Sequence, residues 1–251
     1  GRVSVIFSYL IFFNVVLAYG METAFFRFYN SEDKGEVVNT STISLFWSSI
    51  LFLGAGLLCR NYLAAWSNID VEYIMFTIWI LVFDALVVIP FSKVRAKGRP
   101  IYYAALKISN VALNVLLNFF FLLWLPEIAK NQPDTFLASL FVTDFEVGYV
   151  FLANVISSLF TLLILLPHYF TIKWHFNFRL WKSMMQYAYP VMIAGVAYAI
   201  NEGFSRPLLE YLNVPMSEIA AYSACYRLVL FMTLFTTAYR LGLEPFFFSH
   251  A

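Results

Sequence analysis

The sequence predicts an all-α integral membrane protein, and three features lead to this prediction. Hydrophobic residues make up 61% of the 251 residues and charged residues only 12%, whereas soluble domains are about 45–50% apolar and about 25% charged. The mean hydropathy of +0.74 is correspondingly high. The apolar residues also form runs that match the roughly 20 residues a helix needs to cross a bilayer. These runs are too long for barrel strands, so helices are expected.

Seven segments have the length and composition of a membrane-spanning helix. They are residues 3–28, 37–58, 71–92, 101–125, 147–167, 187–209 and 217–241. The gaps between them are too short for a soluble domain with its own active site. The sequence also lacks a phosphate-binding loop, an HExxH helix and a Ser/His/Asp arrangement. We therefore expect no catalytic residues, no metal site and no cofactor, and Cys59 and Cys225 are read as small membrane residues.

The gap at 93–99 sets the expected orientation of the chain. Basic residues near the ends of spans are retained on the cytoplasmic side, and this gap holds four of them and no acidic residue, namely Lys93, Arg95, Lys97 and Arg99. Alternation of the spans then places the gaps 29–36 and 168–186 inside as well. The long gap at 126–146 falls outside, where acidic residues outnumber basic ones.

Polar residues within the expected spans are the candidate site residues, because such groups are costly in a bilayer. The most regular set lies on the segment 101–125. There Lys107, Asn110, Asn114 and Asn118 follow spacings of three, four and four, which place them on one helix face. The asparagines either line a water-filled cavity or bond to neighbouring helices. Lys107 either joins that cavity or extends to the inner surface.

Charged residues on four other segments complete the candidate set. They are Glu22, Arg27, Asp84, Glu202, Arg206 and Arg227. Glu202 and Arg206 are four residues apart, so a structural ion pair is the alternative to a transport role there. Arg27 lies near the inner end of its span and could serve only to anchor it. A buried arginine such as Arg227 suits a phosphate, because its planar donors can hold two oxygens at once.

Several runs of the sequence resemble bacterial polysaccharide flippases of the O-antigen type. The runs are Tyr19 to Phe28, Pro90 to Asn118, Tyr189 to Glu202, and Tyr222 to Phe247. This family belongs to the multidrug/oligosaccharidyl-lipid/polysaccharide superfamily, which also contains lipid II flippases and multidrug extruders. Ser205 departs from the pattern, since the family often has an acidic residue before the arginine that is Arg206 here.

The resemblance implies a MATE-like fold, in which two helical bundles face a central cavity in the bacterial cytoplasmic (inner) membrane. Residues 1–167 would then supply spans of the N-terminal bundle, 168–186 the cytoplasmic linker, and 187–251 the first spans of the C-terminal bundle. We expect the chain to be a fragment with about seven spans. Gly1 would begin outside without a signal sequence, and the chain ends abruptly at Ala251.

The resemblance also implies the function. The family moves an undecaprenyl-pyrophosphate-linked oligosaccharide from the cytoplasmic to the outer leaflet during lipopolysaccharide and O-antigen synthesis, by alternating access between bundles. The expected pyrophosphate-binding residues are Lys107, Arg27, Arg206 and Arg227. The residues expected to contact sugar hydroxyls are Asn110, Asn114 and Asn118. The candidates for exchanging a coupling ion are Glu22, Asp84 and Glu202.

The expected partners are membrane lipids, H+ or Na+ as the coupling ion, and a polysaccharide polymerase, with no nucleic acid. Two alternatives remain open at this point. A multidrug or cation extruder of the same fold would need an acidic, aromatic cavity, whereas the in-span charges here include several bases. An integral-membrane glycosyltransferase or acyltransferase would need clustered His, Asp or Arg at one interface, or a sizeable outer domain.

Overall fold

The computed structural model describes residues 2–67, 69–131, 135, 141–143, 145–203 and short stretches between 208 and 239. This described part is helical and contains no strand. The elements in chain order are α1 (Arg2–Ala18), α2 (Met21–Tyr29), α3 (Lys34–Ser67), α4 (Val71–Ala96), α5 (Pro100–Phe119), the π-helical turn η1 (Phe120–Trp124), α6 (Leu125–Asn131), α7 (Glu146–Leu165), α8 (Pro167–Thr171) and α9 (Phe178–Gly203).

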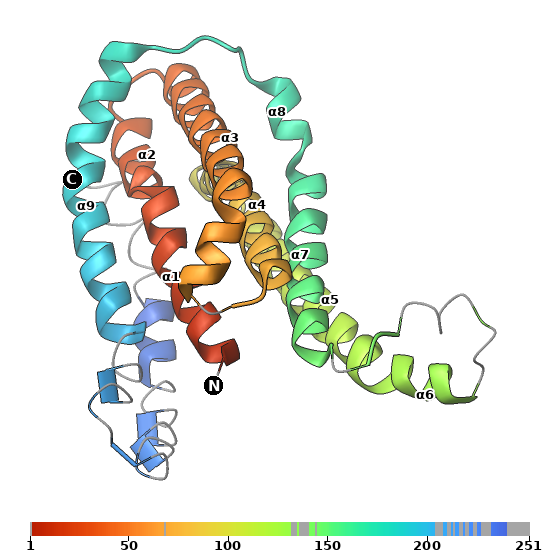
Figure 1. Ribbon diagram of the computed structural model, residues 1–251. Helices are drawn as coiled ribbons and strands as arrows, with labels where there is room; N and C mark the ends of the chain where they lie inside the picture. Colours follow the sequence, from red (N-terminus) through yellow and green to blue (C-terminus); the bar gives the residue numbers. More distant parts are fainter. Residues whose placement is uncertain are drawn as a thin grey trace.

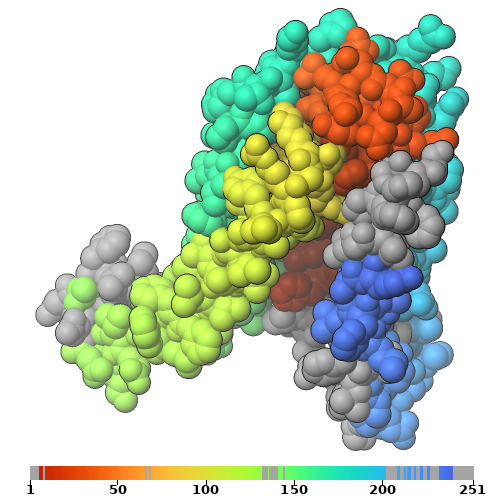
Figure 2. All heavy atoms as spheres, turned by 180° about the vertical axis from the view of Figure 1, so that it is seen from behind, coloured from red at the N-terminus to blue at the C-terminus, as the bar shows by residue number. Residues whose placement is uncertain are grey.

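The helices form a bundle around α4, which packs against α3, α7 and α1 (Figure 1). Helix α9 covers α1 and α2 on one side of the bundle. Helix α5 lies at the other side and packs mainly against α7. Seen from behind, α5 runs along the surface, and the surface is hollowed between α5 and residues 232–239, with α1 at the floor (Figure 2).

Within the described residues, five segments are long and apolar enough to cross a membrane. They are Tyr9–Tyr29, Lys34–Ala65, Val71–Ala96, Pro100–Asn131 and Glu146–Thr171. They correspond to the first five predicted spans, so the prediction of a helical membrane protein agrees with the structure. The sixth prediction, at 187–209, falls on α9, which begins earlier, at Phe178, and is not among these five segments. The seventh, at 217–241, lies only in part within the described residues.

The first predicted span is interrupted rather than continuous. Tyr19 and Gly20 have positive φ angles of 35° and 70°, and they separate α1 from α2. Close packing explains the interruption, since a Cβ atom added at Gly20 would lie 2.4 Å from the Ala188 carbonyl oxygen of α9. Only glycine permits both this backbone conformation and this approach without strain. Helix α2 is therefore a separate short element that packs closely on α9.

Helix α4 contains Pro90 in its interior, and a neighbouring helix compensates for it. Proline has no N–H group, so the carbonyl four residues earlier, that of Leu86, loses its partner within the helix. The Tyr169 hydroxyl on α8 donates a hydrogen bond to this carbonyl at 2.7 Å. Such replacement partners are how membrane helices tolerate proline. The contact joins α8 to the middle of α4.

The three gaps expected on the cytoplasmic side lie at one end of the bundle (Figure 1). Polar contacts between the helix ends show this directly. The Lys93 ammonium lies 3.2 Å from His168 Nδ1, and His168 Nε2 lies 3.1 Å from the Thr42 hydroxyl. At the same end, the Asn177 side-chain amide donates to the Glu36 carboxylate at 2.8 Å. The three gaps that charge assigns to one side of the membrane therefore lie at the same end of the bundle.

Candidate functional site: a polar layer between α4, α5 and α7

A carboxylate lies near the middle of α4, and its partners come from the two helices beside it. Ser158 of α7 donates a hydrogen bond to Asp84 Oδ1 at 2.8 Å. The positive charge of Lys107 on α5 also acts on Asp84. In the sequence, Asp84 is a lone acidic residue within an apolar run. The structure supplies it with a hydroxyl and a base, which is the arrangement that a charged group within a membrane needs.

Asn110 extends this polar layer along the contact between α5 and α7. Its Nδ2 donates to the Ser157 carbonyl at 2.9 Å and to the Thr161 hydroxyl at 2.8 Å. Ser157 and Thr161 are both buried. Of the two roles considered for the asparagines, the described contacts of Asn110 are those of an interhelical hydrogen bond.

The other two asparagines bond to each other along the same helix. Asn118 Nδ2 donates to the backbone carbonyl of Asn114 at 2.8 Å and to its Oδ1 at 2.9 Å. Both side chains are partly buried. The regular spacing therefore produces a polar stripe as predicted, but its members have different partners, because the contacts depend on which helix faces each turn.

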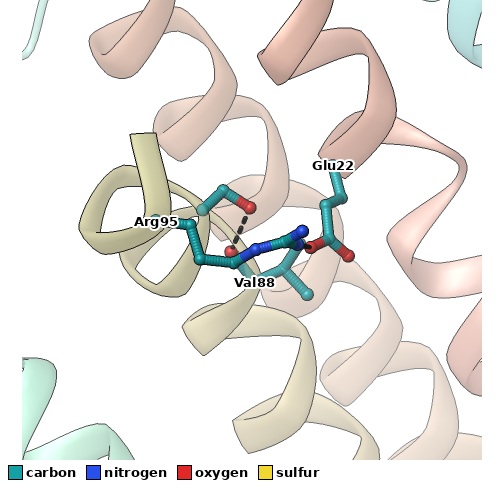
Figure 3. Close-up of polar contacts among 4 residues, drawn as sticks. Glu22, Val88 and Arg95 are labelled. Atoms are coloured by element: carbon teal, nitrogen blue, oxygen red, sulfur yellow. Dashed lines mark hydrogen bonds and ion pairs between the residues drawn. The ribbon is translucent and has the colours of Figure 1, made fainter. Parts of the chain in front are cut away.

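A row of cations and aromatic rings connects Lys107 to the end of the bundle that carries residues 93–99. Lys107 Nζ lies 4.5 Å from the centroid of the Phe91 ring, and Phe91 meets Tyr103 edge-to-face at 5.5 Å. The Arg95 guanidinium lies 5.6 Å from the Tyr103 centroid. Arg95 then reaches across to α2, where its NH1 lies 2.9 Å from Glu22 Oε1 (Figure 3). Two predicted site residues, Lys107 and Glu22, are thus linked through residues of α4 and α5.

Among the remaining candidates, Arg27 is described and is not part of this row. Arg27 is exposed, and its guanidinium lies 4.9 Å from the centroid of Tyr187 on α9. Glu202 lies within α9, but its side chain is outside the described residues, as are Arg206 and Arg227 altogether. Among the residues that the structure describes, no three His, Cys, Asp or Glu side chains gather as a metal ion would require.

Arg95 and the hydroxyls of α7 are the contributors that sequence reasoning missed. Arg95 was counted only as a loop base, because the predicted span ended at residue 92, whereas α4 continues to Ala96. A cluster of hydroxyl residues in an apolar segment could have indicated a polar contact on α7. These residues are Ser157, Ser158 and Thr161, which lie within about one turn. Their partners could not be read from that pattern, because it does not specify which helix lies opposite.

A separate cavity of about 540 Å³ lies between α3 and α9. Its lining is mostly aromatic and apolar, with serine hydroxyls at one side: Tyr19, Ile43, Ser44, Trp47, Ser48, Phe176, Trp181 and Met185. The Trp181 indole donates to Ser44 Oγ at 2.8 Å, and the Tyr19 hydroxyl lies 2.7 Å from the same oxygen. These bonds join α3 to α9 and to the break between α1 and α2.

Comparison of the chain with family models, with curated proteins and with solved structures finds no match. The flippase family therefore stays a resemblance carried by the sequence runs quoted above.

Proposed function

We propose that the chain is part of a membrane transporter that moves an undecaprenyl-pyrophosphate-linked oligosaccharide from the cytoplasmic to the outer leaflet of a bacterial inner membrane. The observation that carries the proposal is the polar layer, in which Ser158 of α7 donates a hydrogen bond to Asp84 of α4, with Lys107 of α5 as a charged neighbour. Ionisable residues within membrane helices are expensive and usually mark a transport pathway. Such a pathway needs no covalent chemistry.

The charges available in this region favour an anionic substrate. Lys107 is exposed on α5, and its stacking on Phe91 holds the ammonium beside the helix rather than letting it extend freely. Arg27 is an exposed base toward the inner end of the bundle. Basic side chains of this kind attract the pyrophosphate of a lipid-linked sugar, which cannot cross hydrocarbon unaided.

The Asp84–Lys107 interaction provides a route for ion coupling. While Asp84 is negative, part of the positive charge of Lys107 is balanced by it. Binding of H+ or Na+ at Asp84 removes that balance and leaves Lys107 more attractive to phosphate. Occupancy of Asp84 by the ion and of Lys107 by phosphate would then be linked, and this linkage acts equally in both directions. A rocking of two MATE-like bundles would convert this coupling into alternating access.

The test is the leaflet in which the lipid-linked oligosaccharide resides. In a host deleted for the gene, a membrane-impermeant sugar label should find the intermediate on the cytoplasmic leaflet, and the intact gene should restore its export. Lys107→Ala and Asp84→Asn should each fail to restore export although the protein is present in the membrane. Lys130→Ala is the matched control, since Lys130 is an exposed base on α6, outside the polar layer, and it should export normally.

Three outcomes would contradict the proposal. Full export by the Lys107→Ala, Asp84→Asn double variant would exclude the polar layer as the transport site. If the intermediate is never made in the deleted host, the protein acts in synthesis, as a membrane transferase would. If its sidedness is unchanged by deletion, the protein does not flip it, and drug sensitivity of the deleted host would then test the multidrug extruder.

A further inference from the structure

The ion pair between Glu22 and Arg95 joins two helices but is unevenly exposed. Arg95 NH1 and Glu22 Oε1 are 2.9 Å apart, with 12% of the Arg95 side chain and 47% of the Glu22 side chain exposed. In Figure 3 the guanidinium extends from α4 toward α2 and meets the carboxylate at its tip. Exposed ion pairs contribute little to stability. An incoming anion can therefore displace Glu22, the better-exposed partner, from Arg95.

Aromatic rings hold the Arg95 guanidinium in position independently of Glu22. Its central carbon lies 4.7 Å from the centroid of Phe26 on α2 and 5.6 Å from that of Tyr103 on α5. Stacking of this type orients the guanidinium plane. At the same end of the bundle, Lys97 and Arg99 are exposed bases in a gap that has no acidic residue. The surroundings of Arg95 therefore attract anions. The anion bound to Arg95 in this structure is the Glu22 carboxylate.

We infer that Arg95 is a binding residue for a phosphate or pyrophosphate group and that Glu22 is its built-in competitor, displaced when the group binds. This inference rests on the proposed function, which supplies the lipid that carries the pyrophosphate. A pyrophosphate has more charge and more acceptor oxygens than one carboxylate, and it matches the forked donors of arginine. Glu22 lowers the affinity of the site by making each incoming phosphate compete for Arg95.

Displacement of Glu22 has a structural consequence for α2. This helix is set apart from α1 by the break at Tyr19 and Gly20, and the Glu22–Arg95 pair is one of its links to α4. Loss of the pair on phosphate binding weakens that link while Phe26 remains stacked on Arg95. Because α2 also packs on α9 through Gly20 and Ala188, occupancy at Arg95 is communicated to α9.

Binding of geranyl pyrophosphate to the protein in phosphatidylcholine nanodiscs tests this inference by calorimetry. Glu22→Gln removes the competing charge and keeps the shape, so it should tighten binding about tenfold, which corresponds to a typical single charge interaction. Geraniol, which lacks the pyrophosphate, should show no such gain. Glu36→Gln is the matched control, because Glu36 lies at the same end of the bundle but bonds to the Asn177 amide, and it should leave binding unchanged.

Arg95 must account for the gain. In the Glu22→Gln background, Arg95→Gln should abolish the tightening, and Arg95→Lys should restore only part of it, because lysine lacks the forked donors. Equal binding by Glu22→Gln and the unchanged protein would overturn the inference, as would tightening that persists without Arg95.

A charge exchange covers the case in which Glu22→Gln does not fold. The Glu22→Arg, Arg95→Glu double variant can re-form the ion pair, but its cation then extends from α2 instead of α4, and position 95 beside Tyr103 carries a carboxylate. Loss of geranyl pyrophosphate binding by this variant supports the inference, and unchanged binding overturns it. If Glu22→Gln tightens geranyl pyrophosphate binding but the intact gene exports no lipid-linked oligosaccharide, the proposed function alone is refuted. If the intact gene exports it but Glu22→Gln does not tighten binding, this inference alone is refuted.

Discussion

Helices α4 and α5 are neighbours in the chain and both are apolar enough to cross a membrane, yet they occupy different environments. Of the most apolar 18-residue window in each segment, 56% is buried inside the protein for α4 but only 11% for Pro100–Asn131, which contains α5. Helix α4 is covered by α1, α3 and α7. Similar composition therefore serves a core helix in one case and an edge helix in the other.

The difference teaches where each helix obtains its stability. For α4, close packing with several neighbours decides how much a side chain contributes, because the protein interior leaves few voids. For α5, most side chains are exposed, so its attachment depends on a narrow contact with α7 and on the polar groups in it. In lipid there is little hydrophobic driving force between helices, so packing and hydrogen bonds are the terms that remain.

The largest expected difference between the two helices comes from truncating a leucine on each. Leu81 on α4 is 1% exposed, and Leu116 on α5 is 65% exposed. Leu81→Ala leaves a cavity and should reduce the free energy of unfolding by about 2–5 kcal/mol. Leu116→Ala should change it by less than about 0.5 kcal/mol. Reversible unfolding in bicelles would measure both, and equal losses would show that α4 is not the core helix.

An intermediate effect is expected at the proline of α4. Tyr169→Phe removes the donor to the Leu86 carbonyl and leaves a buried acceptor unsatisfied, at a cost of about 1–3 kcal/mol. Tyr102→Phe on the exposed face of α5 is the control and should have almost no effect.

A double-mutant cycle with Pro90→Ala decides the cause of that effect. Alanine at position 90 supplies the missing backbone N–H to Leu86, so Tyr169→Phe should then cost much less than it does beside proline. If the cost is the same in both backgrounds, Tyr169 stabilises the bundle by packing rather than by this hydrogen bond.

The smallest expected effect concerns the polar contact of α5. Asn110→Leu loses two hydrogen bonds to α7, and interhelical bonds in membranes average about 0.6 kcal/mol. Asn154 on α7 bonds instead to the Val150 carbonyl of its own helix, so Asn154→Leu should be close to neutral. The same unfolding measurement would compare the pair. If Asn110→Leu does not change the free energy of unfolding, the hydrogen bonds of Asn110 do not stabilise the bundle, which favours the cavity-lining role predicted from the sequence.

The sequence predicted the long apolar helices well, and it predicted helix ends less well. The predicted span ends at residue 92, one turn too early, because the charged residues that follow favour a loop, whereas α4 continues to Ala96. The break between α1 and α2 was not expected either. Gly20 is visible in the sequence, but the reason for it is the Ala188 carbonyl of α9, far away in the chain.

The sequence likewise identified some residues of the candidate site but not the residues that they contact. The residues Asp84, Lys107 and Asn110 were identified from their position in apolar runs, because the cost of a polar group in a bilayer depends only on its local surroundings. The sequence did not identify their partners, which are Ser158, Thr161 and Phe91. These partners lie on helices whose rotation and neighbours are set by packing across the bundle.

Local composition was therefore enough to determine that this chain forms long apolar helices and which of their ends carry the basic residues. Backbone hydrogen bonds within a helix and the length of an apolar run are properties of consecutive residues. The tertiary structure alone decided that α4 lies inside and α5 at the edge, and that Arg95 meets Glu22. Those outcomes depend on contacts between residues far apart in the chain, which hydropathy and spacing do not encode.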